Sequence, residues 1–197
     1  MTTETGYDFH TKIFNTCSAL MQLIEQLPVP VISVVTGVAA AAGCQVVASS
    51  DIVVATPNSR FSTPGASVGL FCHTPGIPLA RRVPRAVSGY MLLTGESITG
   101  TEAYNAGLVS RLVEDDLIQA ELDRICAAIA AKPRGVTALG KRFYKQQIEM
   151  SLSQAYGAGG KVMTENLWYK DAQEGIAAFK EKRKPNFCHT DETLAAT

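Results

Sequence analysis

The chain has 197 residues, of which 46% are apolar and 18% are charged, and its 18 Lys and Arg balance its 18 Asp and Glu. A chain this apolar and without net charge is not disordered as its main state. The charge balance argues against nucleic-acid binding as the main activity, because a phosphate-reading surface needs an excess of positive charge. No apolar run reaches the ~20 residues that a membrane-spanning helix requires, so no membrane span is predicted.

Five cysteines are dispersed through the chain: Cys17, Cys44, Cys72, Cys126 and Cys188. Their number is odd and no Cys-x-x-Cys pair occurs, which argues against a disulfide framework or a zinc ribbon and favours a reducing compartment. Each is expected to act as a small buried hydrophobe. The N-terminal residues are acidic and lack arginine, so they do not have the pattern of a signal peptide or a mitochondrial transit peptide.

The first half of the chain predicts alternating helices and strands. A helix is expected over residues 9–27, because apolar side chains recur there at helical spacing: Ile13, Cys17, Leu20 and Ile24. Residues 31–35 and 51–55 are β-branched runs typical of strands buried on both faces. The alanine-rich residues 38–50 between them predict a helix. This strand–helix–strand order predicts a βαβ unit with parallel strands.

The second half of the chain predicts mostly helices. Residues 58–76 are rich in glycine and proline and are expected to be a loop. Thr99–Glu102 and Ser151–Gln154 match the capping box that opens a helix. Two further apolar stripes follow at helical spacing: Ile118, Leu122, Ile125 and Ile129, then Leu152, Tyr156, Gly159, Met163 and Leu167. The sequence therefore predicts an α/β region over 1–98 and a helical region over 99–197, with a hinge near Gly95–Gly100.

Gly65–Gly69 spells Gly-x-Ser-x-Gly, the pattern of the nucleophile elbow in serine hydrolases. An elbow needs a strand directly before it and a helix directly after it, whereas Thr63-Pro64 precedes this motif. The triad would also need a downstream acid followed by a histidine, but His73 comes only six residues after Ser67. We therefore interpret the motif as a turn in a loop.

Three other features could carry chemistry, and each has a simpler interpretation. His73 could exchange a proton near neutral pH, or it could be a loop histidine without a role. A helix that begins within Ala39–Gly43 would expose backbone N–H groups and a positive dipole that can hold an oxyanion, or it could simply be a packing helix. The basic run over 179–187 could contact the phosphates of a nucleotide-like ligand, or it could be a solvated helix end.

Segments spread over nearly the whole chain resemble the crotonase, or enoyl-CoA hydratase/isomerase, superfamily in their order and spacing: residues 28–37, 41–45, 50–55, 60–69, 93–99, 103–109 and 175–185. Pro64–Gly76, with its Gly-Leu-Phe-Cys-His-Thr-Pro-Gly, resembles one branch in particular. The resemblance implies an α/β fold with a ββα spiral core, incomplete at its N-terminus because the chain begins after the family's first oxyanion loop. Residues 99–197 would then be a helical trimerisation or lid region.

The resemblance also implies a ligand, an assembly and a location. The ligand is an acyl-CoA thioester of fatty-acid metabolism, and no metal or separate cofactor is implied. The assembly is a homotrimer or hexamer. The implied location is mitochondrial, and otherwise cytoplasmic.

Site residues follow from the same resemblance. The N–H of Ala42 takes the place of one of the family's two oxyanion donors. The surrounding pocket comprises Ala41, Gly43, Gln45, Gly65 and Gly69. His73 falls where dienoyl-CoA isomerases of the family carry an additional acid, so it is implied to be an acid or base. Phe179 and Lys182 are implied to contact coenzyme A.

The two glutamates of the family's hydratases map onto Gln45 and Gly65. An amide does not exchange a proton at neutral pH and glycine has no side chain, so glutamate-pair hydration is not expected. Two functions remain open. One is an acyl-CoA-directed enzyme, hydratase- or isomerase-like, that uses His73. The other is a non-catalytic acyl-CoA-binding or regulatory subunit, which Gln45 and Gly65 favour.

Overall fold

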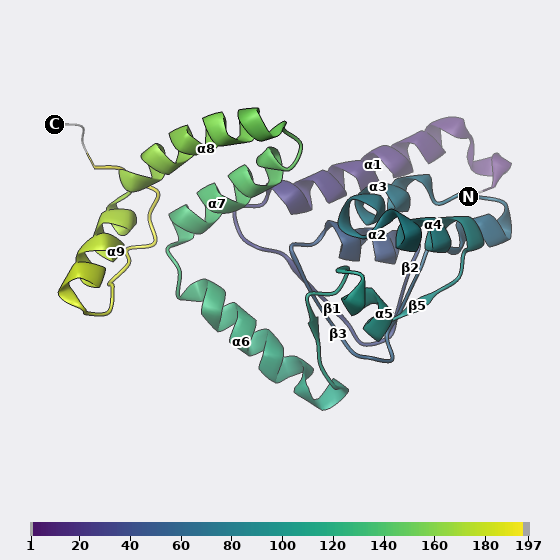
Figure 1. Cartoon of the computed structure of the whole chain (residues 1–197). Coiled ribbons are helices and arrows are strands. Elements are labelled where there is room, and N and C mark those ends of the chain that lie inside the picture. Colours follow the sequence, from purple (N-terminus) through teal and green to yellow (C-terminus); the bar gives the residue numbers. More distant parts are fainter. Residues whose placement is uncertain (1, 195–197) are drawn as a thin grey trace. The chain divides into compact units, whose positions relative to one another are not determined.

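The computed structural model describes residues 2–194 (Figure 1), in two compact units. The first takes in Pro30–Leu122 and the residues up to Gln26, and the second takes in Leu27–Val29 and the residues from Asp123 onward. The first unit thus extends past residue 98, where the sequence places the end of the core. The assignment of 99–197 to a trimerisation or lid region stays a prediction, and residues 1 and 195–197 lie outside the described chain.

Two three-stranded sheets form the frame of the first unit. One has the order β1-β3-β6 and is entirely parallel: β1 (Ile32–Val35), β3 (Ile52–Ala55) and β6 (Arg111–Leu112). The other has the order β2-β4-β5, with β4 parallel to β2 and antiparallel to β5: β2 (Val38–Ala40), β4 (Arg60–Ser62) and β5 (Ile98–Thr99). The first four strands enter the two sheets alternately, and each pair of strands is followed by a helix, so this part of the chain winds as the expected ββα spiral.

The helices of the first unit cover these strands: α1 (Tyr7–Gln26), α2 (Ala42–Ser49), α3 (His73–Arg82), α4 (Arg85–Thr94) and α5 (Gly100–Asn105). Three short 3₁₀ helices join them: η1 (Thr3–Thr5), η2 (Pro64–Val68) and η3 (Asp115–Leu117). α2 packs against α3, and α3 packs against α4. Figure 1 shows these three helices gathered at one end of the strands.

The core of the first unit centres on β3, the middle strand of the parallel sheet. Val53, Val54 and Ala55 have no exposed surface, as expected for a strand with a sheet neighbour on each side and packed faces. Leu79 of α3 and Met91 of α4 are equally buried and belong to the same core. The apolar β-branched run at 51–55 therefore forms the buried strand that its composition predicts.

Two local predictions were wrong. Residues 38–50 do not form one helix, because Val38–Ala40 is a strand whose Ala39 pairs with Phe61. Residues 58–76 are not simply a loop, because they contain β4, η2 and the beginning of α3. In both places a backbone partner about 20 residues away overrides the local preference of alanine for helix and of glycine and proline for loop.

The second unit is helical: most of α6 (Ile118–Ala130), then α7 (Arg134–Gln147), α8 (Leu152–Leu167) and α9 (Lys170–Glu181). α7 packs against α8, and α8 contacts α9. Both predicted capping boxes form: Thr99 opens α5 with Glu102, and Ser151 opens α8 with Gln154. The apolar stripe predicted on α8 is largely exposed, with Leu152 at 75% and Tyr156 at 77%.

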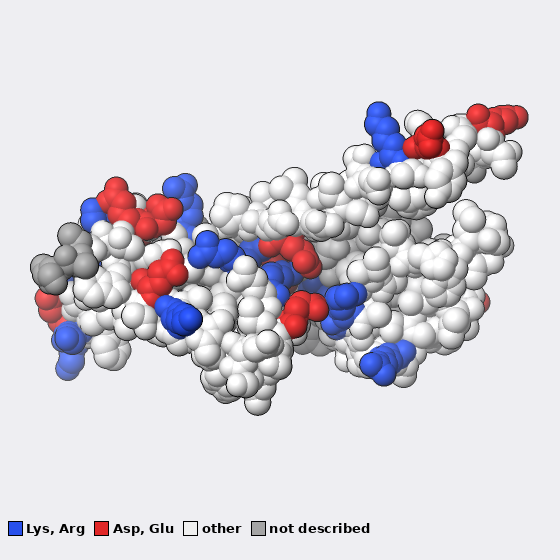
Figure 2. Space-filling view, turned by 90° about the horizontal axis from the view of Figure 1, so that it is seen from above, with Lys and Arg blue, Asp and Glu red and all other residues white. Residues whose placement is uncertain are grey.

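Charged side chains of both signs are mixed over the face seen in Figure 2, with broad uncharged areas between them. This mixing agrees with the equal numbers of acidic and basic residues in the chain. Within residues 2–194, no helix combines the length and the apolar character that crossing a membrane demands.

Candidate functional site

The first element of the candidate site is the sharp entry into α2. Strand β2 ends at Ala40, and a single residue, Ala41, turns the chain into the helix with a φ of 48°. The N–H of Ala41 donates to the carbonyl of Ser62 at 3.0 Å. This bond to β4 holds the positive-φ turn, which costs an alanine free energy that a glycine would not lose. The sheet therefore sets both the position and the direction of the helix start.

The first turn of α2 presents backbone N–H groups without side chains over them. The N–H of Gln45 makes the bond to the carbonyl of Ala41 at 3.0 Å, so the N–H groups of Ala42, Gly43 and Cys44 precede the helical ladder. Ala42 and Gly43 are both exposed, and apart from its chain neighbours and its own helix backbone, no described atom lies within 4 Å of where a Gly43 side chain would begin. This terminus can therefore accept a negatively charged oxygen.

The side chain of Gln45 lies inside the protein, where it is 4% exposed. Its Oε1 faces the thiol of Cys17 on α1, which donates to it at 3.8 Å. An amide in this position can donate and accept hydrogen bonds, but it carries no proton to transfer. Gln45 thus bridges the start of α2 and α1 without offering an exchangeable proton.

Gly65 lies in the 3₁₀ turn η2, where the chain folds back on itself. Its N–H donates to the sulfur of Cys72 at 3.3 Å, and its carbonyl accepts from the N–H of Leu70 at 2.8 Å. A β-carbon on Gly65 would lie 2.1 Å from the Leu70 oxygen and 2.8 Å from the Cys72 sulfur. Gly69 closes the turn in the left-handed conformation, with φ 77°. This turn has no room for a side chain at position 65.

His73 is the first residue of α3, and its side chain is exposed. The imidazole centroid lies 5.0 Å from that of the Phe71 ring, with a tilt of 55° between the planes. The backbone N–H of His73 donates to the Phe71 carbonyl at 2.8 Å. No hydrogen bond of the His73 ring with another side chain occurs among residues 2–194, so the described chain leaves both ring nitrogens available.

Two buried cysteines join these pieces. Cys44 on the first turn of α2 interacts electrostatically with Cys72, which directly precedes His73 and contacts Gly65. Burial, with a smaller contribution from Cys72, raises the pKa of the Cys44 thiol to about 12, and a hydrogen bond with the Ser62 backbone opposes the rise. Cys44 is therefore a packing residue that remains protonated. The Cys44–Cys72 pair therefore links the start of α2 to the η2 turn and to the start of α3.

Two features of this region were not foreseen from the sequence. The sulfur of Cys72 accepts the N–H of Gly65, whereas the sequence indicated only a small apolar side chain there. Thr63, just before the turn, is fully buried, and within the described chain its hydroxyl lacks a hydrogen-bond partner. Neither has a sequence signal, because each depends on how a loop closes on itself. The structure does not support a nucleophile elbow at Gly65–Gly69, since Ser67 lies in a 3₁₀ turn with its side chain exposed.

Phe179 and Lys182 lie at the end of α9, in the second unit. Phe179 is 85% exposed, and Lys182 follows the helix in the left-handed conformation with φ 54°.

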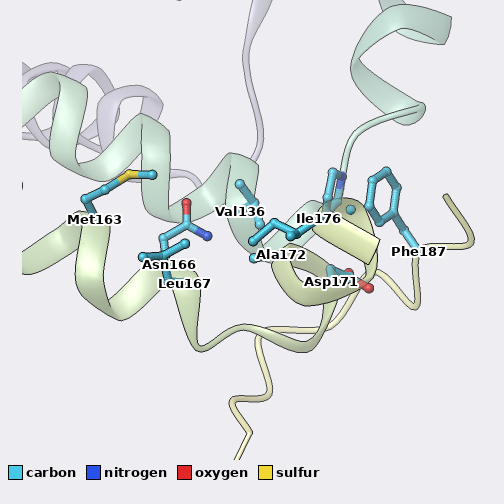
Figure 3. Close-up of a pocket in the computed structure, with 10 residues that line it drawn as sticks. Val136, Met163, Asn166, Leu167, Asp171, Ala172, Ile176 and Phe187 are labelled. Carbon is cyan, nitrogen blue, oxygen red and sulfur yellow. The ribbon is translucent and has the colours of Figure 1, made fainter. Parts of the chain in front are cut away.

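The second unit also has an apolar pocket of about 300 Å³ lined by Val136, Met163 and Ile176 among others (Figure 3). Across the described ranges of both units, no three His, Cys, Asp or Glu side chains converge as a metal ion would require.

Comparison with known proteins gives a consistent assignment. The family model described as enoyl-CoA hydratase/isomerase matches residues 1–190. The mitochondrial enoyl-CoA hydratase domain-containing protein 3 of Xenopus laevis is 50% identical over 190 residues, which are 96% of this chain and 65% of that protein. The chain spans between 62% and 65% of the length of this relative and its rat and human counterparts. These relatives represent the branch that Pro64–Gly76 indicates.

Solved structures agree with the sequence relatives. The crystal structure of human enoyl-CoA hydratase domain-containing protein 3 superposes with a TM-score of 0.93 at 49% identity, covering 94% of this chain and 74% of that one. The crystal structure of an enoyl-CoA hydratase from Mycobacterium smegmatis gives the same TM-score at 42% identity, covering 96% and 74%. The spiral of alternating sheets is therefore the arrangement that these proteins share.

Proposed function

Because the chain belongs to the enoyl-CoA hydratase/isomerase family, we propose that it binds an acyl-CoA thioester at the start of α2. The observation that carries the proposal is the pair of exposed residues, Ala42 and Gly43, at the first turn of that helix. The N–H of Ala42 donates to the thioester carbonyl, and the helix dipole favours the negative charge that develops there. Phe179 and Lys182 contact the coenzyme A portion, and no metal or further cofactor takes part.

The pocket around the reacting carbons is formed by small or uncharged residues: Ala41, Gly43, Gln45, Gly65 and Gly69. Water addition by a pair of glutamates does not occur here, because neither Gln45 nor Gly65 can exchange a proton. The contact between Gly65 and Cys72 supports this conclusion, since it occupies the space from which an acidic side chain would project.

The reaction that these groups support is proton transfer along the acyl chain. The His73 imidazole removes a proton from a carbon conjugated with the thioester, and the C–H electron pair moves into the carbonyl as an enolate. The Ala42 N–H holds the enolate oxygen. The imidazolium then returns its proton to a different carbon, so that the double bond moves and the composition of the thioester is unchanged.

A second function, a non-catalytic acyl-CoA-binding or regulatory subunit, is favoured by one observation. The closed η2 turn at Gly65 leaves no space for an acidic side chain at that position. Such a protein would use the same Ala42 contact to hold the thioester without turning it over. Both functions belong to fatty-acid metabolism.

The names of the vertebrate relatives place those proteins in mitochondria. By analogy we place this chain there, acting as a homotrimer or hexamer. The largely exposed apolar stripe on α8, which includes Leu152 and Tyr156, supports association, since exposed apolar surface of this kind favours contact with another chain.

A His73→Ala variant separates the two functions. The test measures double-bond migration in enoyl- and dienoyl-CoA thioesters by the absorbance of the conjugated product. If His73 transfers the proton, turnover falls by about 10²–10⁴-fold while thioester binding persists. The matched control is His10→Ala, which removes a half-buried imidazole on α1, hydrogen-bonded to Thr5 and far from α3 in sequence. Equal turnover by wild type and His73→Ala would remove His73 from the mechanism, and binding without any turnover would establish the non-catalytic function.

A further inference from the structure

The chain reverses direction at the end of α9 through a backbone conformation that lysine rarely adopts. Lys182 has φ 54° and ψ 37°, and its N–H donates to the Phe179 carbonyl at 3.3 Å. A residue with a β-carbon loses free energy in this left-handed region, where glycine would not. A strained non-glycine residue persists only where its surroundings hold it, and such residues concentrate at functional sites.

Arg183, the residue after Lys182, makes the contacts that hold the left-handed turn. The guanidinium of Arg183 makes two parallel bonds to the carboxylate of Glu174, from Nη1 at 2.6 Å and from Nη2 at 2.9 Å. Its Nε donates to Glu181 at 2.6 Å. Arg183 therefore joins the residue before the strained turn to the middle of α9. Because the pair with Glu174 is bidentate, it fixes the orientation of the guanidinium as well as its distance.

Glu174 also holds the chain beyond the turn. Its Oε1 accepts the backbone N–H of Asn186 at 2.7 Å, so one carboxylate ties the chain on the far side of Lys182 to α9. The next residue, Phe187, lines the apolar pocket together with Gly175 and Ile176 (Figure 3). The turn is thus anchored by polar contacts at Glu174 and by apolar contacts one residue further on.

The basic side chains around this turn divide into two kinds. Arg183 is engaged by two carboxylates. Lys182 and Lys184 make no ion pair with any residue of the described chain, and both are exposed. The left-handed turn therefore presents unpaired ammonium groups within a few residues of Phe179, whose ring is also exposed. An exposed aromatic ring together with unpaired cations suits a nucleotide that carries phosphates.

We infer that Glu174 is a positioning residue for the coenzyme A contact: through Arg183 it holds the left-handed turn that presents Lys182 beside Phe179. The inference rests on the proposed function, which places coenzyme A at these two residues. The pairing with Arg183 and the Asn186 N–H lowers the pKa of Glu174 to about 2, so the carboxylate remains charged throughout the neutral range. Glu174 itself touches no ligand, because its carboxylate is fully engaged by Arg183 and Asn186.

The test measures the affinity of the 197-residue chain for coenzyme A and for pantetheine, which has the same thiol arm without the nucleotide phosphates. Glu174→Gln removes the charge with little change of shape, and Arg183→Lys keeps the charge but removes the bidentate pair. Each is expected to weaken coenzyme A binding about tenfold, as loss of a phosphate contact would, and to leave pantetheine binding unchanged. The matched control is Glu165→Gln, the same change at an exposed carboxylate on α8.

A double variant distinguishes a role of Glu174 in positioning Lys182 from a general loss of structure at the end of α9. If Glu174 acts through Lys182, the Glu174→Gln/Lys182→Ala variant binds coenzyme A no more weakly than Lys182→Ala alone. Losses that multiply in the double variant, or a Glu174→Gln variant that binds like wild type, would overturn the inference and leave the proposed function intact. A wild-type chain that binds neither thioester nor coenzyme A would overturn both. If Glu174→Gln does not melt cooperatively, Arg183→Lys carries the same comparison.

Discussion

The backbone N–H of Gly65 donates to the sulfur of Cys72 at 3.3 Å, and this bond closes the turn directly before α3. The contact leaves no room for a β-carbon on Gly65. The glycine at position 65 is therefore required by the backbone and its packing, because any side chain at this position would require the turn to open.

The first prediction follows from that packing. Gly65→Ala places a carbon 2.1 Å from the Leu70 carbonyl oxygen and should lower the free energy of unfolding by at least the ~1–3 kcal/mol typical of overpacking. The matched control is Gly43→Ala, where the new carbon meets nothing within 4 Å and lies in a helix; it should be neutral or stabilising by ~0.5–1 kcal/mol. Urea unfolding monitored by circular dichroism measures both, and equal stabilities would show that the turn adapts freely.

The second prediction concerns thiol reactivity. Burial raises the pKa of Cys44 to about 12, whereas Cys126 and Cys188 are exposed. Because the thiolate is the species that is alkylated, iodoacetamide at pH 8 should modify Cys126 and Cys188 and spare Cys44 in the folded protein. In urea all five cysteines should react, which serves as the control. Mass spectrometry locates the label, and modification of Cys44 at the rate of Cys126 would mean that the junction of α2 and α3 opens readily.

The third prediction gives the pH dependence of stability. Folding lowers the pKa of Glu174 from 4.5 to about 2, chiefly through its hydrogen bonds with Arg183. A depressed carboxyl pKa stabilises the folded state above the unfolded pKa, and this stabilisation is lost as the pH falls through the folded pKa. The stability difference between wild type and Glu174→Gln should therefore be constant above about pH 5 and should shrink towards pH 2.

Urea midpoints at several pH values test this expectation. Glu165→Gln, whose carboxylate lies 4.0 Å from Arg142 on the surface, should show a much weaker dependence, because a loose exposed pair contributes little. A stability difference for Glu174→Gln that stays the same from pH 6 to pH 2 would mean that the Arg183 pair does not persist in solution.

The fourth prediction concerns the chain that follows α9. Asp171 is 1% exposed, and its carboxylate accepts the N–H of Cys188 at 2.7 Å and that of Thr190 at 3.2 Å. Asp171→Ala leaves both donors without this acceptor and should cost ~1.5–3 kcal/mol of stability. Limited proteolysis should then cut first between residues 183 and 194. Asp171→Asn keeps one acceptor oxygen and should be cut more slowly, and unchanged cleavage in both variants would show that Asp171 does not hold this segment.

Elements governed by local pattern were predictable from the sequence. The helix stripe that includes Ile125 and the capping boxes that begin at Thr99 and Ser151 depend on residues within a few positions of one another. The parallel pairing of Ile32–Val35 with Ile52–Ala55 was also foreseen, because two β-branched runs on either side of a short helix leave few alternatives.

What the sequence could not predict depends on distant partners. Val38–Ala40 is a strand because Arg60–Ser62 lies beside it, and no alanine-rich pattern reveals such a neighbour. The environment of Gly65 likewise depends on Cys72, seven residues further on. The pairing of Arg183 with Glu174 was missed for the same reason, because the turn at Lys182 brings the arginine back over the helix. The closed turn at Gly65 and the contacts that anchor Arg183 could thus not be predicted, and the roles of the site residues named from the sequence remain predictions.

Thermal melting of the purified chain, with and without a panel of acyl-CoA thioesters, tests directly whether the chain binds such a ligand. A ligand at 100 times its dissociation constant adds about 2.7 kcal/mol of stability, and each kcal/mol raises the Tm of a chain this size by roughly 2–4 °C. We expect a cooperative melt whose midpoint rises by about 5–10 °C with a suitable thioester. A cooperative melt that no thioester shifts would contradict the proposal that the start of α2 binds an acyl-CoA.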